Sequence, residues 1–300
     1  MTRRKLVGFE ISAYFCYNII TDFRHNYWSI MMNINLIEEK AKEIRIEVIK
    51  MLGEAKSGHP GGSLSAADIM AALYYSELKI DPADPGWEER DRFVLSKGHA
   101  APVLYSVLAL KGYIDLEILK TLRKTGSILQ GHPDMKKVPG VEMSTGSLGQ
   151  GFSAAVGMAL SFKMYDKPNR VYALLGDGEC QEGIVWEAAM AAVHYELDNL
   201  VAILDNNGLQ IDGKCTEVMC LGSLRNKWAA FGFNVIEIDG HNIPEILKAF
   251  DKARETKGQP TLILAKTIKG KGVDFMEDIA EWHGVAPDKD QVAKALEELK

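Results

Sequence analysis

Arg170-Val-Tyr-Ala-Leu-Leu-Gly-Asp-Gly-Glu179 is a short apolar run that stops at a carboxylate between two glycines. Residues 184–194 have the apolar spacing of a helix, and Leu200-Val-Ala-Ile-Leu-Asp-Asn-Asn-Gly-Leu209 is a second apolar run with a polar end. Together they predict a strand, a helix and a second, parallel strand. Such a βαβ unit places Asp177 and Asn207 at neighbouring carboxyl ends, the edge where open α/β sheets bind ligands.

Asp177 and Asn207 lie thirty residues apart and offer two hard oxygen ligands beside glycines that let another molecule approach the backbone. This set suits Mg²⁺ bound to a diphosphate better than zinc or calcium. Gly-Asp and Asn-Gly are also common turn dipeptides, so two plain turns are the competing interpretation. The spacing and the intervening βαβ unit favour the diphosphate interpretation.

Strand and helix patterns alternate along the rest of the chain. Apolar runs predict further strands over 92–95, 233–238 and 260–265. Apolar periodicity predicts helices over 34–56, 65–78, 101–111, 115–124, 149–165, 243–256 and 291–300. The alternation predicts an α/β fold, a doubly wound and mostly parallel sheet with helices on both faces. We find no repeat or linker in the sequence and expect residues 33–300 to form one domain.

Composition excludes some classes of protein. The net charge is −6 and the body of the chain has no basic run, which argues against a nucleic-acid partner. The four cysteines have no zinc-site spacing and are expected to be reduced thiols in a cytoplasmic protein.

The first 32 residues differ from the rest. Met1-Thr-Arg-Arg-Lys5 is basic, but Glu10 and Asp22 interrupt any apolar signal segment. No apolar run approaches the ~20 residues needed to span a bilayer, so we expect no membrane anchor. Met31-Met32 directly precedes the first amphipathic pattern. We expect residues 1–32 to be a disordered extension or sequence translated from an over-early start.

Gly-Asp-Gly followed by Asn-Asn at this spacing is the pattern of thiamine diphosphate enzymes, and other motifs resemble transketolase in particular. In family order they are Ser57-Gly-His-Pro-Gly61, Leu95-Ser-Lys-Gly-His-Ala100, Gly131-His-Pro133, Ser144-Thr-Gly-Ser-Leu-Gly-Gln-Gly151 and Trp282-His-Gly284. The resemblance runs from about residue 35 to the C-terminus. It covers the first third to half of a transketolase, the diphosphate-binding domain, and implies a thiamine-diphosphate-binding fold.

The resemblance also implies roles for individual residues. It adds the backbone carbonyl of Leu209 to Asp177 and Asn207 as a magnesium ligand. The implied cofactor contacts are Gly178, Lys269, His99 and His283 at the diphosphate, Gly146 and Leu148 at the aminopyrimidine, and Ile211 at the thiazolium. His59 and His132 would face the substrate's hydroxyls and carbonyl, where histidine suits proton transfer near neutral pH. Glu182 would lie at a dimer interface beside a catalytic glutamate of the other domain.

Several of these residues have ordinary structural alternatives. Ile211 could be a core residue at a strand end, and Lys269 a solvated loop lysine. Glu182 could serve only to stabilise a helix N-terminus. His194 is expected to be structural, and His241 to be a turn and cap residue.

In transketolases, the glutamate that activates the cofactor and the arginines that bind the sugar phosphate lie in a second, pyrimidine-binding domain. The sequence contains no such domain, so the resemblance implies the N-terminal subunit of a split transketolase. It would be inactive alone and would pair with a pyrimidine-domain subunit in a 2+2 assembly. The complete enzyme would move a two-carbon ketol unit from a ketose phosphate such as xylulose 5-phosphate to an aldose phosphate, as in the pentose phosphate pathway.

Other thiamine diphosphate proteins share part of the pattern. Deoxyxylulose-phosphate synthase and the α-subunits of 2-oxoacid dehydrogenases also have Gly-Asp-Gly and Asn-Asn, and a non-catalytic cofactor-binding regulatory subunit is a further alternative. Ser-Gly-His-Pro-Gly, Gly-His-Pro and Trp-His-Gly together favour transketolase. His59, His99 and His132 favour a catalytic subunit, since a plain binding module does not need three histidines at the reactive end.

Overall fold

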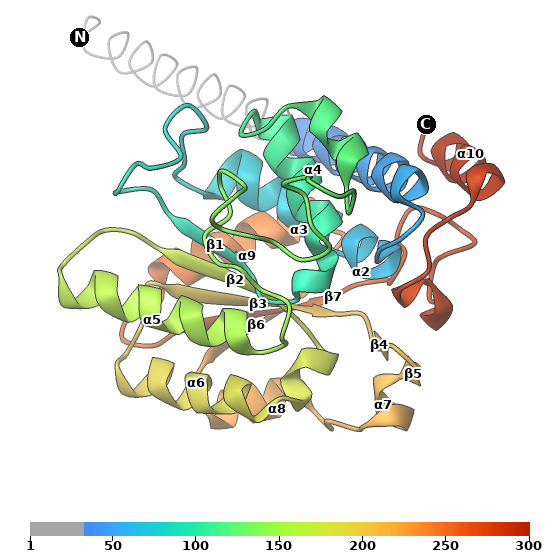
Figure 1. Ribbon diagram of the computed structural model, residues 1–300. Coiled ribbons are helices and arrows are strands. Elements are labelled where there is room, and N and C mark those ends of the chain that lie inside the picture. Colours follow the sequence, from blue (N-terminus) through green and yellow to red (C-terminus); the bar gives the residue numbers. More distant parts are fainter. Residues whose placement is uncertain (1–32) are drawn as a thin grey trace, which may run out of the picture.

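The computed structural model describes residues 33–300, and its centre is a five-stranded parallel sheet (Figure 1). The strands lie in the order β1-β2-β3-β7-β6, and every pairing between neighbours is parallel. Their bounds are Arg92–Leu95 (β1), Val171–Gly176 (β2), Leu200–Asn206 (β3), Asn234–Asp239 (β6) and Thr261–Lys266 (β7). All five strands were predicted, and the α/β fold with a mostly parallel sheet is confirmed.

Helices cover both faces of the sheet (Figure 1). One face carries the helical residues 33–55, α2 (Pro60–Ser65), α3 (Ala67–Ala72), α4 (Ala101–Lys111) and α9 (Ile243–Glu255). The other face carries α5 (Gln150–Met164), α6 (Gly183–His194) and α8 (Leu224–Ala230). Each face of the sheet has its own hydrophobic core; the first lies under α2, α3, α4 and α9, and the second under α5, α6 and α8. Side chains alternate across β2, because Tyr172 and Leu174 belong to the first core and Ala173 and Leu175 to the second. Burial on both faces explains why the strands are continuous apolar runs.

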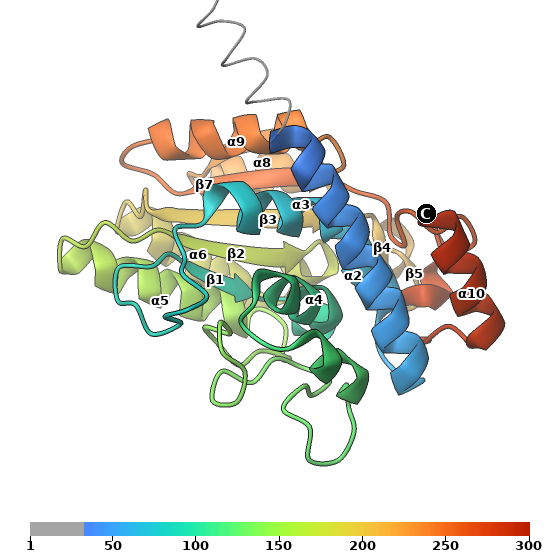
Figure 2. The same ribbon diagram turned by 90° about the horizontal axis from the view of Figure 1, so that it is seen from above.

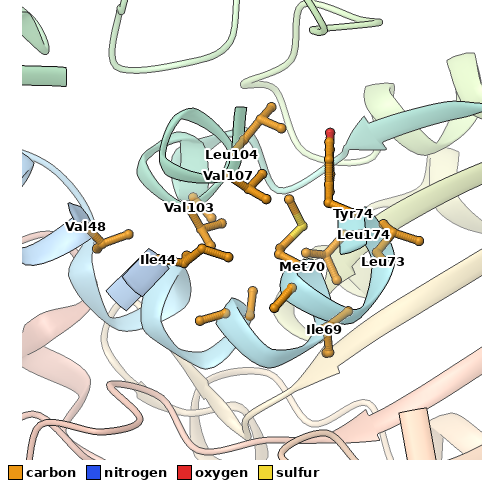
Figure 3. Packing of buried hydrophobic residues seen from close by; sticks show 14 of the residues in the cluster. Ile44, Val48, Ile69, Met70, Leu73, Tyr74, Val103, Leu104, Val107 and Leu174 are labelled. Atoms are coloured by element: carbon orange, nitrogen blue, oxygen red, sulfur yellow. The ribbon is translucent and has the colours of Figure 1, made fainter. Parts of the chain in front are cut away.

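The first core fixes the segments that lead into the site. Figure 3 shows Ile44, Met70 and Val103, from three different helices, packed together, and all three are 0% exposed. The helical residues 33–55 cross over α2 and α3 beside the sheet (Figure 2). Close packing of these helices fixes the position of the turns before α2 and α4, which carry His59 and His99.

Two predicted helices were wrong in detail. The segment 115–124 forms a 3-10 helix, η3 (Leu116–Thr121), because only Leu119 and Leu122 are buried and Leu116 is 45% exposed. The predicted helix 65–78 is divided into α3 and a π-helical turn, η1 (Leu73–Glu77), with α2 before it.

Several short elements were not predicted from sequence. These are a hairpin, β4 (Leu209–Gln210) with β5 (Gly213–Lys214), the helices α7 (Cys215–Val218) and α8, and the 3-10 turns η4 (Gly178–Gln181) and η5 (Ala280–His283). The last helix is α10 (Lys289–Glu298), which a capping box from Asp288 and Gln291 begins. Short elements have too few residues to show a period, so sequence patterns miss them.

The prediction for residues 1–32 lies outside the described residues. Within residues 33–300, no helix has both the length and the apolar character that crossing a membrane requires. Cys180, Cys215 and Cys220 are free thiols.

Candidate active site

The loops after β1, β2, β3 and β7 meet at one edge of the sheet, since parallel strands share the direction of their carboxyl ends. They enclose a cavity of about 400 Å³. Twelve of the thirteen predicted site residues line it: His59, His99, Gly146, Leu148, Asp177, Gly178, Glu182, Asn207, Leu209, Ile211, Lys269 and His283. A larger groove of about 870 Å³, between residues 50–56 and the start of α10, contains none of them.

Asp177 is buried at the floor of the cavity, with only 3% of the residue exposed. Its Oδ1 accepts a hydrogen bond from the Gly178 N–H at 2.8 Å, and its Oδ2 accepts one from the Gly208 N–H at 2.5 Å. Burial, together with the negative charge of Asp205, raises the pKa of Asp177 to about 6. A cation bound at this carboxylate would favour its ionised form.

The oxygen atoms beside Asp177 are of the kind that bind a magnesium ion shared with a diphosphate. Asn207 and Leu209 line the cavity beside Asp177, and the Asn207 Oδ1 accepts a hydrogen bond from the Leu209 N–H at 3.1 Å. No group of three His, Cys, Asp or Glu side chains within residues 33–300 is arranged to hold a metal by itself. Mg²⁺ commonly takes one or two carboxylates or amides and completes its shell with phosphate oxygens and water.

Lys269 reaches the same cavity from the loop after β7. It is 2% exposed, and its Nζ lies 2.9 Å from His283 Nδ1 and 3.4 Å from the Leu209 carbonyl oxygen. Burial lowers its pKa to about 8, although the charge of Asp177 opposes this shift. The alternative of a solvated loop lysine is therefore wrong.

Three imidazoles form a triangle above these groups. The ring centroids of His59, His99 and His283 lie between 5.1 and 5.5 Å apart. Burial lowers the pKa of His59 to about 4 and that of His283 to about 3, and it holds the pKa of His99 well below its usual value. Neighbouring cations, among them Lys269, lower these pKa values further. All three rings are therefore uncharged at neutral pH.

His132 does not line the cavity and is exposed beside it. A Cβ on Gly146 would lie 3.1 Å from the Cγ of His132, so the His132 ring lies against the Gly146 backbone. Burial of part of the ring and the charge of Arg123 lower the pKa of His132. Its predicted role at the substrate stays a prediction.

The remaining wall is built from glycine backbone and apolar side chains. Gly146 has a φ of 154°, and a Cβ on Gly98 would lie 2.7 Å from the Gly146 nitrogen. The loops that carry Gly98 and Gly146 therefore touch through their backbones. Ile211 lines the cavity but is 67% exposed, so the alternative of a core residue is wrong. Glu182 lies at the N-terminus of α6, where its side chain makes no capping hydrogen bond.

Comparison with known proteins places this geometry in a family. The family model for the transketolase thiamine diphosphate binding domain matches residues 37–299. The chain belongs to the transketolase family. Its fold is the thiamine-diphosphate-binding α/β fold, and its enzyme class is transferase.

Two relatives that the match covers almost completely are transketolase subunits. The subunit SqwG of the 6-deoxy-6-sulfo-D-fructose transketolase from Clostridium sp. (strain MSTE9) is 48% identical over 264 residues, which are 88% of this chain and 96% of the relative. One subunit of the apulose-4-phosphate transketolase from Phocaeicola vulgatus is 44% identical over 89% of this chain and 95% of the relative. The match covers nearly the whole of each of these subunits, which confirms the resemblance to the N-terminal, cofactor-binding section of transketolase.

A solved structure shows the same fold within a longer chain. The transketolase from Campylobacter jejuni superposes with a TM-score of 0.84 at 39% identity, and the match covers 88% of this chain and 43% of that one. These matches favour transketolase over deoxyxylulose-phosphate synthase and the 2-oxoacid dehydrogenase subunits.

Further residues of this transketolase site were not predicted from sequence. Lys97 and Asp205 form an ion pair beneath the cavity, 2% and 0% exposed in their side chains. Gln210 lines the cavity, and its buried Nε2 has no hydrogen-bond partner among residues 33–300, so it offers a donor to a ligand. Lys97 and Asp205 lie inside recognised motifs, but their pairing could not be predicted because their side chains are 108 residues apart in sequence.

Glu179 was also missed, although it ends the Gly-Asp-Gly-Glu motif. Its carboxylate accepts hydrogen bonds from Ser96 Oγ, from the Gly149 N–H at 2.8 Å and from the Gly176 N–H at 3.0 Å. It therefore joins the loops after β1 and β2 to the start of α5. Burial raises its pKa, and these donors oppose that shift.

Proposed function

We propose that this chain binds Mg²⁺ and thiamine diphosphate in the 400 Å³ cavity and, with a pyrimidine-domain subunit, transfers a two-carbon ketol unit between sugars. Bound thiamine diphosphate would supply the carbanion-stabilising chemistry that ketol transfer requires. We further propose that the assembly contains each subunit in two copies and works in the cytoplasm.

One arrangement supports the proposal above the others. A buried carboxylate, a buried lysine and three uncharged imidazoles surround one cavity at the carboxyl edge of the sheet. A bound diphosphate with a divalent cation would compensate both buried charges, because the cation would neutralise the Asp177 carboxylate and the diphosphate would neutralise the Lys269 ammonium group. Each uncharged imidazole has one nitrogen that donates and one that accepts a hydrogen bond, which suits contacts to diphosphate oxygens and to the hydroxyl and carbonyl groups of a sugar.

The residues would divide the work as follows. Asp177, Asn207 and the Leu209 carbonyl would hold the metal. Gly178, Lys269, His99 and His283 would bind the diphosphate, and Gly146, Leu148 and Ile211 would face the rings. His59 and His132 would face the sugar, and Glu182 would meet the partner subunit.

The surroundings of the cavity support a partner that completes the site. Ile211, Val218 and Met219 expose between 43% and 67% of their surface on the β4–β5 hairpin and α7. Exposed apolar side chains that lie together mark interaction surfaces. None of the described residues that line the cavity is an arginine, so the partner would supply the group that binds a substrate phosphate.

The sugar itself is chosen by that second half of the site. The relatives are named for 6-deoxy-6-sulfo-D-fructose and for apulose 4-phosphate, which both carry an anionic group. We therefore propose a ketose with a terminal anionic group as donor, with a pentose phosphate such as xylulose 5-phosphate as one member of the class.

The test is to assay ketol transfer by the full chain with and without a co-purified pyrimidine-domain chain. The donors are xylulose 5-phosphate, apulose 4-phosphate and 6-deoxy-6-sulfo-D-fructose, and the Asp177→Ala chain with the same partner is the control. We expect turnover only in the complex with wild-type Asp177. Turnover by the isolated chain would refute the need for a partner, and release of CO₂ from a 2-oxoacid without ketol transfer would refute the proposed reaction.

A further inference from the structure

The loop that carries Lys269 is held from both sides of that lysine. On one side, the Ile268 N–H donates a hydrogen bond to His241 Nε2 at 2.8 Å. On the other side, the Lys271 carbonyl oxygen accepts one from Arg45 Nε at 3.0 Å. The two anchors come from different elements, since His241 precedes α9 and Arg45 lies in the helical residues 33–55.

Both anchors end on one carboxylate. Asp68 of α3 accepts hydrogen bonds from Arg45 Nη1 at 3.0 Å and Nη2 at 2.5 Å, and it lies 2.7 Å from His241 Nδ1. We call Asp68, Arg45 and His241 the Asp68 network. Asp68 and Arg45 are each 8% exposed, so these bonds are largely shielded from water.

The hydrogen bonds define the state of the histidine. Because Nε2 accepts from the Ile268 N–H, it carries no proton, and Nδ1 therefore donates to Asp68. Burial opposes ionisation of Asp68, but the charge of Arg45 and the hydrogen bonds from His241 and Arg45 keep its pKa below the usual value. A charged Asp68 thus orients both the guanidinium and a neutral imidazole.

His241 is free for this role because another residue caps the next helix. The Asn242 side chain accepts the hydrogen bond from the Glu245 N–H at 3.1 Å and is the N-cap of α9. The expectation that His241 is a turn and cap residue was therefore wrong about its ring. The ring points away from the cap, to Asp68 and to the loop after β7.

The position of the Lys269 ammonium group depends on the position of its loop, because the lysine stem is tightly packed and has little room to adjust. A Cβ on Gly61 would lie 2.8 Å from the Lys269 Cγ, so the stem lies directly on the Gly61 backbone. The Gly270 N–H also donates to the Gly61 carbonyl oxygen at 3.0 Å. A shift of Ile268 or Lys271 would move the ammonium group away from the cavity floor.

We propose that the Asp68 network positions Lys269 for the diphosphate of the cofactor, with His241 as a positioning residue that touches neither cofactor nor substrate. The inference rests on the proposed contact between Lys269 and the diphosphate. It adds residues from α3, from the helical residues 33–55 and from the turn before α9 to the determinants of cofactor affinity.

The experiment is a double-mutant cycle between His241 and Lys269, read as cofactor affinity rather than activity. The dissociation constant of thiamine diphosphate for the full chain is measured by calorimetry at saturating Mg²⁺. The variants are His241→Ala, His241→Gln, Lys269→Met and His241→Ala with Lys269→Met. His194→Ala, at the exposed end of α6, is the matched control.

We expect His241→Ala to weaken cofactor affinity about tenfold, the effect of losing one buried hydrogen bond to the loop. His241→Gln keeps an acceptor for the Ile268 N–H and should restore most of the affinity, which a merely space-filling role would not predict. In the Lys269→Met background, His241→Ala should change affinity less than about twofold, because the lysine it positions is gone. The control should bind like the wild type.

The outcomes separate the two proposals. If Lys269→Met weakens binding but His241→Ala weakens it by the same factor in both backgrounds, the network acts elsewhere and the inference is refuted. If Lys269→Met leaves affinity unchanged, the proposed diphosphate contact is wrong and the inference falls with it, while ketol transfer by the complex remains a separate measurement. Thermal unfolding without cofactor checks each fold, and His241→Asn, which keeps the donor to Asp68, replaces His241→Ala if that chain unfolds.

Discussion

Replacing Lys97 by methionine should destabilise the chain strongly even without any cofactor. Lys97 donates hydrogen bonds to Asp205 and, at 2.8 Å, to the Gly62 carbonyl oxygen. Asp205 is 0% exposed, and Ser65 and Thr267 donate their hydroxyl groups to it. Methionine keeps most of the apolar stem but leaves the buried Asp205 carboxylate without the cation that pairs with it.

Removing one partner of a buried ion pair costs about 3–5 kcal/mol. At roughly 2 °C per kcal/mol for a chain of this size, the melting temperature should fall by roughly 6–10 °C. The assay is thermal unfolding followed by circular dichroism without thiamine diphosphate or Mg²⁺. Adding Asp205→Asn to Lys97→Met should recover part of the loss, because neither charge of this pair then remains buried.

Lys50→Met is the matched control for the loss of a lysine charge. Lys50 pairs with Glu47 one helical turn away, and 53% of its side chain is exposed. Exposed pairs of this kind contribute at most about 1 kcal/mol, so the control should melt within about 2 °C of the wild type. If Lys97→Met also melted within about 2 °C of the wild type, Asp205 would not depend on Lys97 and the reasoning would be refuted.

Three other predictions concern the site. Asp177→Ala should abolish Mg²⁺-dependent cofactor binding with an unchanged circular dichroism spectrum; calorimetry that finds wild-type affinity would contradict the metal assignment. His132→Ala should lower turnover of the assembled enzyme about 10²-fold while cofactor affinity changes less than twofold; the reverse pattern would assign the ring to the cofactor. The folded-state pKa values of His59, His99 and His283 are lowered, so the unfolded chain binds more protons as pH falls. Stability without cofactor should therefore decline as the pH falls from about 6.5 to about 3, and it should decline less in His59→Asn. If urea unfolding gave equal declines for the wild type and His59→Asn, burial of the His59 ring would not be the cause.

Much of the site was predictable because its residues lie in short motifs at strand ends. Asp177 and Asn207 follow β2 and β3 directly, so the βαβ pattern alone places them at one edge. His59, His99 and His283 occur in glycine-flanked turns, where the family resemblance marks them. His132 also has such a motif, yet it lies outside the cavity lining, because a motif does not state which way its ring points.

Pairings between distant side chains were not predictable. The Asp68 network joins residues 23 and 173 positions apart in sequence, and no local pattern marks Asp68 as anything but a polar residue in an apolar helix. His241 in particular was assigned to its turn, since Asp-Gly-His-Asn before a helix has the composition of a cap. Only the packing of α3 against α9 brings its ring to Asp68.

By itself the sequence determined the five strands of the parallel sheet, most of the long helices and the transketolase motifs, because apolar periodicity and strand-end turns are local properties. The tertiary structure decided which charges are buried and what they contact. Lys269 and Lys97 are ordinary loop lysines in sequence, and each is 2% exposed in the fold. Burial raises the free energy of a charge unless a partner or ligand lies close by, and such partners are supplied here by segments that only folding brings together.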